Sequence, residues 1–330
     1  MSRVALSKAM KKVFVNLKRF ETPRRVGGLA PVDDPAHWIR SIIADSIHMI
    51  AQFRGELELV FILGEGLIVP ARQRLSEAPG RPPDEITLGC QGVHWEDVEV
   101  GGNFGAFTAQ RPASSARFLG CDWVLVGHSE ERRALLQVIV AFEPELARSP
   151  ALQTRAAIAV DGLLSRGILA ALNCGLKVLL CVGETLAERG EGDFETQKAG
   201  VAQVLSGQLQ RALQGIGRDA GGPQHVVVAY EPVWAIGPGK EPPAAHVIDF
   251  TARLIKDIVH EHCGFVPQVV YGGGLKAQNA AELGAIAALD GALVGLTQFE
   301  HPVGFDVGQL REIASLYLQP TTKAPGPIKD

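Results

Sequence analysis

One stretch of the sequence, HVVVAYEPVWAIGPGK at residues 225–240, has the pattern of a buried strand followed by a loop rich in Pro, Gly and small residues. It begins with a short run of apolar and β-branched residues, which favours a strand buried on both faces. Glu231 ends this run, and the segment after it has the mixture of Pro, Gly and small residues that is typical of a lid. In parallel α/β folds the functional groups follow the strands in this way.

Similar apolar runs recur along the chain and give eight candidate strands. They are VFVN at 13–16, LELVFIL at 57–63, EITLGC at 85–90, WVLVG at 123–127, KVLLCVG at 177–183, HVVVAYE at 225–231, QVVYGG at 268–273 and GALVG at 291–295. Stretches with helical periodicity separate most of them, for example at 194–217, 244–263, 275–284 and 307–318. Because no strand has the pattern of a polar edge, a closed (β/α)8 barrel is favoured. The pattern alone leaves an open doubly wound sheet as the alternative.

A single barrel domain is expected to occupy residues 12–318. An N-terminal extension at 1–11 precedes it, and a Pro-rich flexible tail at 319–330 follows it. Extended loops are expected after strands 1, 3 and 4, and residues 92–105 lengthen the loop after strand 3.

The loops after strands 1 and 4 carry local signals of their own. Residues 21–35 are rich in Pro and Gly, and Asp34 stands before a proline, where it can cap the next helix. The helical pattern at 133–173 is too long for one helix, and Pro144 and Pro150 break it into pieces. We therefore expect an extra helix after the fourth strand.

Composition excludes several classes of protein. With 46% hydrophobic and 21% charged residues, the chain can bury a large core. The formal net charge is -4 and basic residues are spread along the chain, which predicts no nucleic-acid partner and no membrane partner. No apolar run reaches the roughly 18 residues of a membrane helix, and the basic first residues lack the apolar stretch of a signal peptide. The five cysteines form no C-x-x-C pair, which favours reduced thiols and a cytoplasmic location.

Polar residues follow the first, fourth and sixth candidate strands. Asn16 and Lys18 are two residues apart, so they would share one face if the first strand extends that far. A lysine that points into the barrel mouth needs an anion there. His128 directly follows WVLVG and begins a polar cluster. Glu231 ends a buried strand, where burial would raise its pKa toward the range useful to a general base.

Glycine-rich loops follow the sixth, seventh and eighth strands, at GPGK, YGGG and LVG. Glycine lets backbone N–H groups approach an anion closely, and the helix after each loop adds a favourable dipole. Together these loops predict a phosphate pocket.

The polar residues and glycine-rich loops described above occur in motifs that resemble those of the triosephosphate isomerase family. The resemblance extends from about residue 12 to residue 318 and rests on motifs in the family's order: NLK, GHSEERR, CVGE, AYEPVWAIGPGK, YGG and LVG. It implies a TIM barrel that interconverts dihydroxyacetone phosphate and glyceraldehyde 3-phosphate through an enediolate.

The resemblance also implies roles for the polar residues. Glu231 would move a proton between adjacent substrate carbons. Neutral His128 would polarise the carbonyl and shuttle protons between the oxygens. Lys18 would stabilise the enediolate and phosphate charge, Asn16 would help to position these groups, and Glu130 would lie near Lys18 as a secondary participant.

By the same resemblance, main-chain N–H groups of Gly237, Gly274, Gly295 and Leu296 would hold the substrate phosphate. Lid closure would exclude water, and this family is itself a standard example of such closure. No metal and no organic cofactor is required, because a carboxylate, an imidazole and an ammonium group handle the protons and charges. The expected partners are a small sugar phosphate and a second copy of the chain in a homodimer.

The chain departs from the family at the phosphate loops, where Gly274 replaces a serine and Leu296 replaces a glycine. Two alternatives follow from these changes and from the long loop after Asn16. One is isomerisation of a related tetrulose phosphate. The other is a barrel that binds a phosphometabolite without turning it over.

Overall fold

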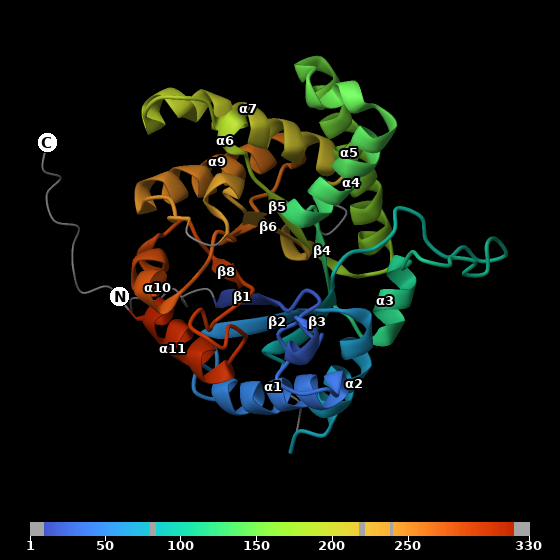
Figure 1. The fold of residues 1–330 in the computed structure, drawn as a ribbon, viewed down its shortest axis with the longest axis vertical. Helices are drawn as coiled ribbons and strands as arrows, with labels where there is room; N and C mark the ends of the chain where they lie inside the picture. Colours follow the sequence, from blue (N-terminus) through green and yellow to red (C-terminus); the bar gives the residue numbers. More distant parts are fainter. Residues whose placement is uncertain (1–9, 80–83, 218–221, 238–239, 320–330) are drawn as a thin grey trace, which may run out of the picture.

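The computed structural model describes residues 10–79, 84–217, 222–237 and 240–319. Eight parallel strands close into a barrel in sequence order, with β8 hydrogen-bonded to β1 (Figure 1). The strands are β1 (Lys11–Asn16), β2 (Leu57–Leu63), β3 (Ile86–Cys90), β4 (Trp123–Val126), β5 (Lys177–Val182), β6 (Val226–Tyr230), β7 (Gln268–Tyr271) and β8 (Gly291–Val294). The predicted (β/α)8 barrel is therefore confirmed, and each strand lies where an apolar run predicted one.

Helices surround the barrel on its outer side (Figure 1). The α-helices are α1 (Pro35–Ile50), α2 (Glu65–Ser76), α3 (Ala113–Leu119), α4 (Ser129–Phe142), α5 (Pro150–Asn173), α6 (Leu186–Arg189), α7 (Phe194–Ala212), α8 (Gly222–His225), α9 (Ala245–Cys263), α10 (Ala277–Ala285) and α11 (Val307–Leu318). Short 3-10 helices lie at η1 (Arg24–Val26), η2 (Pro144–Ala147) and η4 (Val233–Ala235).

The predicted helices agree with the structure except near their ends. The helix expected at 194–217 ends at Ala212, because the chain turns at Gly215, whose φ of 79° favours glycine. The helix expected at 275–284 begins two residues later, where Lys276 is extended and its N–H donates to the Asn279 side chain. Asp34 caps α1 as predicted, since its Oδ1 accepts the N–H of Ala36 at 2.9 Å.

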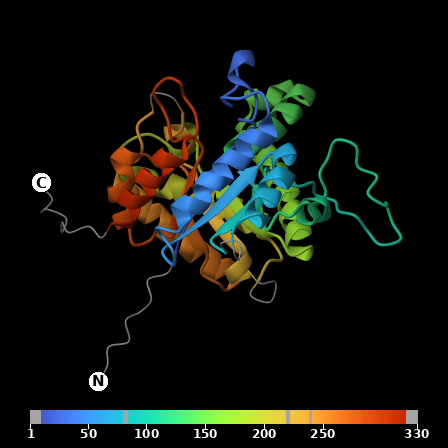
Figure 2. The ribbon, with the colours of Figure 1, turned by 90° about the horizontal axis from the view of Figure 1, so that it is seen from below.

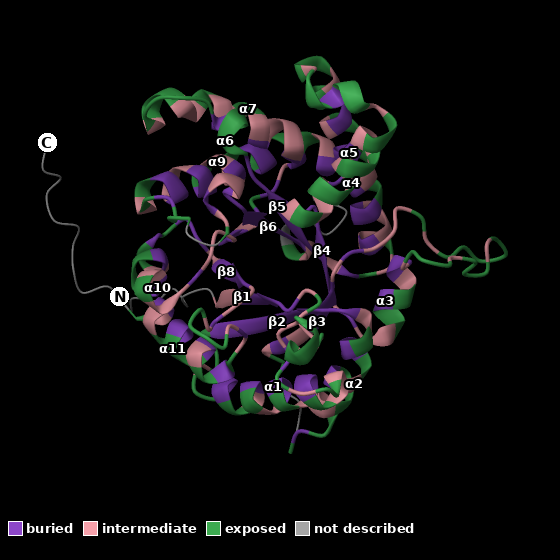
Figure 3. Ribbon diagram, in the orientation of Figure 1, coloured by how far each residue is buried: buried purple, intermediate pink, exposed green. Residues whose placement is uncertain are grey.

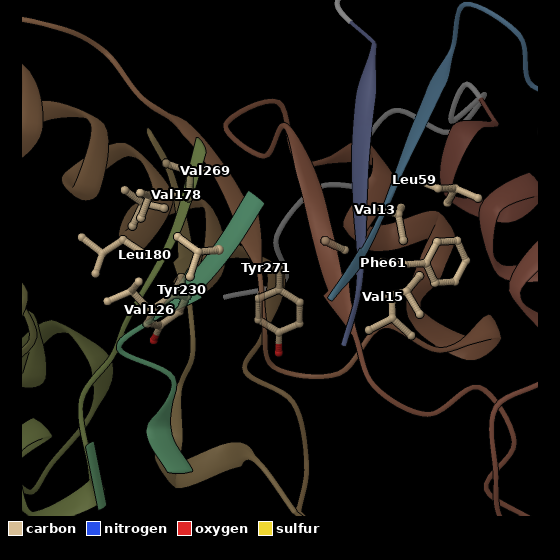
Figure 4. Packing of buried hydrophobic residues seen from close by; sticks show 14 of the residues in the cluster. Val13, Val15, Leu59, Phe61, Val126, Val178, Leu180, Tyr230, Val269 and Tyr271 are labelled. Carbon is tan, nitrogen blue, oxygen red and sulfur yellow. The ribbon is translucent and has the colours of Figure 1, made fainter. Parts of the chain in front are cut away.

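The core has two layers because side chains alternate across each strand. Residues such as Phe14 and Trp123 fill the barrel interior, where their rings meet edge to face at 5.1 Å. Val13, Val15 and Phe61 point outward and pack beneath the helices (Figure 4). Figure 3 shows the result: most strand residues are buried, and the helices are exposed on their outer side. Strands buried on both faces explain why the apolar runs were continuous.

Long connections follow β1, β3 and β4. The connection at residues 91–112 projects from the side of the barrel (Figure 2). After β4 the chain forms α4, η2 and α5 in place of one helix, so the extra helix predicted there is present, with breaks before Pro144 and Pro150.

Helix α5 has 24 residues and a mean hydropathy of 1.4 over its most apolar window, so by length and composition it could cross a membrane. Half of that window is buried inside the protein, and the helix carries the fully buried Asp161. These features are those of a core helix. The predicted extension at 1–11 and tail at 319–330 lie almost entirely outside the described residues.

Candidate active site

The carboxyl ends of parallel strands meet at one end of the barrel, and the polar residues predicted there come together. Asn16 ends β1, His128 follows β4, and Glu231 follows β6. Asn16 and Glu231 are almost fully buried, although each carries a polar side chain. A mouth lined by buried polar groups is the setting in which electrostatic interactions are strong.

Glu231 is held by groups from neighbouring strands. Its Oε2 accepts the N–H of Ser129 at 2.9 Å, and its Oε1 lies 3.3 Å from Nε2 of His128. Burial raises the pKa of Glu231, and His128, the Ser129 N–H and a hydrogen bond from the Cys181 thiol partly offset that rise. At Gly272, at the end of β7, a Cβ atom would lie 2.9 Å from Cγ of Glu231. Any larger residue there would therefore displace the Glu231 side chain.

His128 is the N-cap of α4. Its Nδ1 accepts the N–H of Glu130 at 3.2 Å. A ring nitrogen that accepts a hydrogen bond carries no proton, so the proton of a neutral imidazole must be on Nε2. This geometry gives a neutral ring with its proton on Nε2, the nitrogen that lies 3.3 Å from Oε1 of Glu231.

Lys18 lies beyond the end of β1. The strand stops at Asn16, and Lys18 has a φ of 45°, so strand alternation does not place its side chain. Instead the Lys18 N–H donates to Oδ1 of Asn16 at 3.1 Å, and Nζ lies 2.7 Å from Oε1 of Glu130. Although partial burial acts to raise the pKa of Glu130, the hydrogen bond from Lys18 lowers it overall. The expected proximity of Lys18 and Glu130 is therefore present, by a turn rather than by a strand.

Two further side chains support this site. Gln91, after β3, donates from Nε2 to Oδ1 of Asn16 and to the carbonyl of Ile62, both at 2.9 Å. The thiol of Cys181, on β5, acts to lower the pKa of Glu231. The sequence reasoning missed both contacts. A signal for Cys181 was present, because it is two residues beyond the interior Leu179 and therefore faces the barrel interior as well.

The residues expected at the phosphate lie in the loops after β6, β7 and β8. A Cβ atom at Gly295 would lie 3.7 Å from the carbonyl oxygen of Asn16, so this loop touches the end of β1. Gly274 and Gly237 have φ values of 100° and 125°, which favour glycine. Leu296 is half-buried and Gly237 is exposed.

The start of the loop after β6 is anchored by a buried carboxylate. Oε1 of Glu184 accepts hydrogen bonds from Arg189 at 2.8 Å, from the hydroxyl of Tyr230 at 3.0 Å and from the indole N–H of Trp234 at 3.0 Å. Glu184 and Arg189 thus form a buried ion pair. Because Trp234 is in η4, this cluster ties the segment after Glu231 to β5.

Within the described part of the chain, no group of three or more His, Cys, Asp or Glu residues is arranged to hold a metal ion. A buried carboxylate, a neutral imidazole and an ammonium group instead converge at the mouth. This set can take a proton from carbon, donate one to oxygen and stabilise an anion.

Comparisons of the sequence with a family model and with known proteins all identify the same family. Residues 44–302 match the sequence model of the family described as triosephosphate isomerase. The triosephosphate isomerase of Alkaliphilus metalliredigens is 32% identical over 257 residues, which cover 77% of this chain and 88% of that protein. The enzyme of the same name from Moorella thermoacetica is 34% identical, over 64% of this chain and 70% of the relative.

Among solved structures, the triosephosphate isomerase from Bartonella henselae has the same fold. The TM-score is 0.63 and the superposition covers 94% of this chain and 99% of that one. At 23% sequence identity, this likeness supports the fold alone.

Proposed function

This chain belongs to the triosephosphate isomerase family, and we propose from that premise which of its residues interconvert dihydroxyacetone phosphate and glyceraldehyde 3-phosphate. The base is Glu231. It removes a proton from the carbon beside the substrate carbonyl, which leaves an enediolate, and returns the proton to the adjacent carbon. Its raised pKa suits this role, because a base works best when its pKa approaches the working pH.

His128 acts as the electrophile. Its neutral ring presents Nε2–H, which can donate a hydrogen bond to the carbonyl oxygen as negative charge develops there. Donation to one oxygen and return from the other would move the hydroxyl proton across the enediolate. The imidazole regains its proton at each turnover, so it is a catalyst and not a reagent.

Lys18 stabilises the negative charge of the enediolate and the phosphate. Glu130 pairs with Lys18 and Asn16 accepts its main-chain N–H, so both hold the ammonium group at the mouth. Main-chain N–H groups at Gly237, Gly274, Gly295 and Leu296 bind the phosphate, and their loops start close to the strand ends. The buried environment increases the strength of each of these interactions.

The segment after Glu231 acts as a lid over the bound substrate. Trp234 anchors its first part to Glu184, and residues 238 and 239 of the lid lie outside the described residues. A closed lid excludes water from the enediolate and suppresses loss of phosphate.

The observation that supports this mechanism most directly is the buried Glu231 carboxylate facing the His128 Nε2–H. A coupled assay of the purified protein with each triose phosphate tests it, with a tetrulose phosphate as the competing substrate. The proposal expects turnover of both triose phosphates and a lower kcat/KM for the tetrulose phosphate. Binding of both without turnover would support the non-catalytic alternative and refute the proposal.

We also propose a cytoplasmic homodimer. The connection at 91–112 carries the exposed apolar side chains of Val100 and Phe104, which a second copy of the chain would cover. Replacing both residues by Ser should convert a dimer to a monomer in sedimentation experiments. A wild-type protein that sediments as a monomer at micromolar concentration would contradict this proposal.

A further inference from the structure

Gly127, the residue before His128, is held on both sides by side chains of helix α4. The N–H of Gly127 donates to Oε2 of Glu131 at 2.6 Å, and its carbonyl accepts from Nε of Arg132 at 2.9 Å. Gly127 has a φ of 77°, and a Cβ atom there would lie 2.9 Å from the carbonyl oxygen of Cys181. The direction in which His128 leaves β4 therefore depends on two charged side chains.

Arg132 is itself locked in place by buried partners. Its Nη1 lies 2.5 Å from Oδ1 of Asp161 in α5, and its Nη2 donates to the carbonyl of Cys181 at 3.3 Å. The other oxygen of Asp161 accepts from Arg211 in α7 at 2.8 Å. A planar guanidinium with three fixed acceptors has one orientation. The chain of contacts thus runs from α7 through α5 to the peptide before His128.

Helix α4 is packed less deeply than α5. None of its residues, from Ser129 to Phe142, is buried, and its apolar contacts with the core come from the partly buried side chains of Leu135, Leu136 and Ile139. Asp161, in contrast, is fully buried. A buried ion-pair triad is often no more stable than apolar residues of the same volume, so stability alone is a weak reason to have one. Orientation of the helix start is a stronger reason.

We propose that Arg132, anchored by Asp161 and Arg211, is a positioning residue that fixes the His128 imidazole relative to Glu231. The proposal rests on the proposed function of His128 as the electrophile. It also makes α5, in the long connection after β4, part of the support of the site. A misplacement of about 1 Å at a reacting group can cost roughly 10²-fold in rate.

The test compares two replacements of Arg132 with a control. Arg132→Met removes every polar contact of this side chain. Arg132→Lys keeps a positive charge beside Asp161, but its single nitrogen replaces the three guanidinium nitrogens that donate to Gly127, Asp161 and Cys181. Lys256→Gln is the control, because it breaks a half-buried ion pair with Asp290, at the start of β8 and away from the mouth. Each protein is assayed for kcat and KM, for its unfolding midpoint, and for the His128 signals in ¹⁵N-histidine NMR spectra.

For Arg132→Met we expect kcat to fall about 10- to 100-fold with KM within about threefold, and the His128 Nε2–H signal to shift or broaden. Arg132→Lys should recover most of the unfolding midpoint while kcat stays low. Lys256→Gln should lower the midpoint and leave both kcat and the His128 signals unchanged. Recovery of kcat together with stability in Arg132→Lys would show a merely structural role and overturn the proposal.

Arg211→Gln provides a milder variant if Arg132→Met does not fold, because the Arg211 side chain is 36% exposed. We expect its kcat to fall about three- to tenfold at constant KM, because the His128 imidazole would be displaced less than in Arg132→Met. An unchanged kcat and unchanged His128 signals would overturn the proposal. If the wild-type protein has no isomerase activity, the proposed function fails, but the NMR signals still report whether Arg132 positions His128.

Discussion

The imidazole of His128 and the carboxylate of Glu231 meet across the barrel mouth, with Nε2 of His128 3.3 Å from Oε1 of Glu231. The ring presents Nε2–H because the N–H of Glu130 occupies Nδ1 at the start of α4. One helix terminus therefore sets the tautomer of His128, and the Ser129 N–H of the same terminus donates to Glu231. Both groups depend on where α4 begins.

The pH dependence of activity should report the environment of Glu231. Burial raises the pKa of Glu231, so the acid limb of kcat/KM should lie above the value of about 4.3 for an ordinary glutamate. The Cys181 thiol stabilises the charged form, so Cys181→Ala should move this limb to higher pH. Cys181→Ser keeps a donor and should leave it near the wild-type position. An acid limb that moves to lower pH in Cys181→Ala would contradict this assignment.

Stability should depend on pH through the same carboxylate. Because the pKa of Glu231 is higher in the folded protein than in the unfolded chain, the folded state binds the proton more tightly. The resulting stabilisation is complete below about pH 4.3 and is lost as pH rises through the folded-state pKa. Glu231→Gln should therefore be more stable than wild type at pH 8, and this difference should vanish near pH 4. Urea unfolding at both pH values measures it, and a less stable variant at pH 8 would refute the argument.

Lys18 should matter for catalysis far more than its neighbour Arg19. Lys18→Met removes the ammonium group at the mouth, and we expect kcat/KM to fall about 10²- to 10³-fold, as for other groups that stabilise a developing anion. Arg19→Met is the matched control, because Arg19 is 60% exposed and pairs with Glu65. It should change kcat/KM less than about threefold, since exposed ion pairs contribute little. Equal losses in the two variants would point to a general charge effect.

Glu184 should be important for stability. Glu184→Gln leaves Arg189, whose side chain is 4% exposed, without its carboxylate, and breaking a buried pair in this way costs about 3–5 kcal/mol. Glu195→Gln removes an exposed carboxylate that pairs with Lys198 on α7, and should cost less than about 0.5 kcal/mol. Denaturant unfolding of both variants measures the difference. Similar small losses would mean that the buried pair is replaceable.

The strands could be predicted because each is buried on both faces over most of its length and is therefore mostly apolar. The end of α7 could not be predicted in this way. Leu213 and Ile216 are buried and continue the apolar pattern beyond Ala212, although the helix has ended and the backbone turns at Gly215. Apolar periodicity reports burial, and it does not report the backbone conformation that buries the side chain.

The site was predictable where a residue's position in a strand determines its place. His128 and Glu231 follow strands directly, so the barrel alone brings them to one mouth. The contact between Gln91 and Asn16 joins residues far apart in the chain and depends on the register of three strands. Lys18 reaches Glu130 through a backbone turn with positive φ, which strand alternation cannot indicate.

The most direct test of Glu231 as the base is deuterium exchange at the substrate carbon. Dihydroxyacetone phosphate is incubated in D₂O with wild-type protein or with Glu231→Gln, and NMR follows deuterium at the reacting carbon. Wild-type protein should incorporate deuterium as it isomerises the substrate, and Glu231→Gln should lose both reactions by roughly 10²- to 10⁴-fold or more. A Glu231→Gln protein that folds, isomerises and exchanges deuterium at the wild-type rate would show that another group is the base.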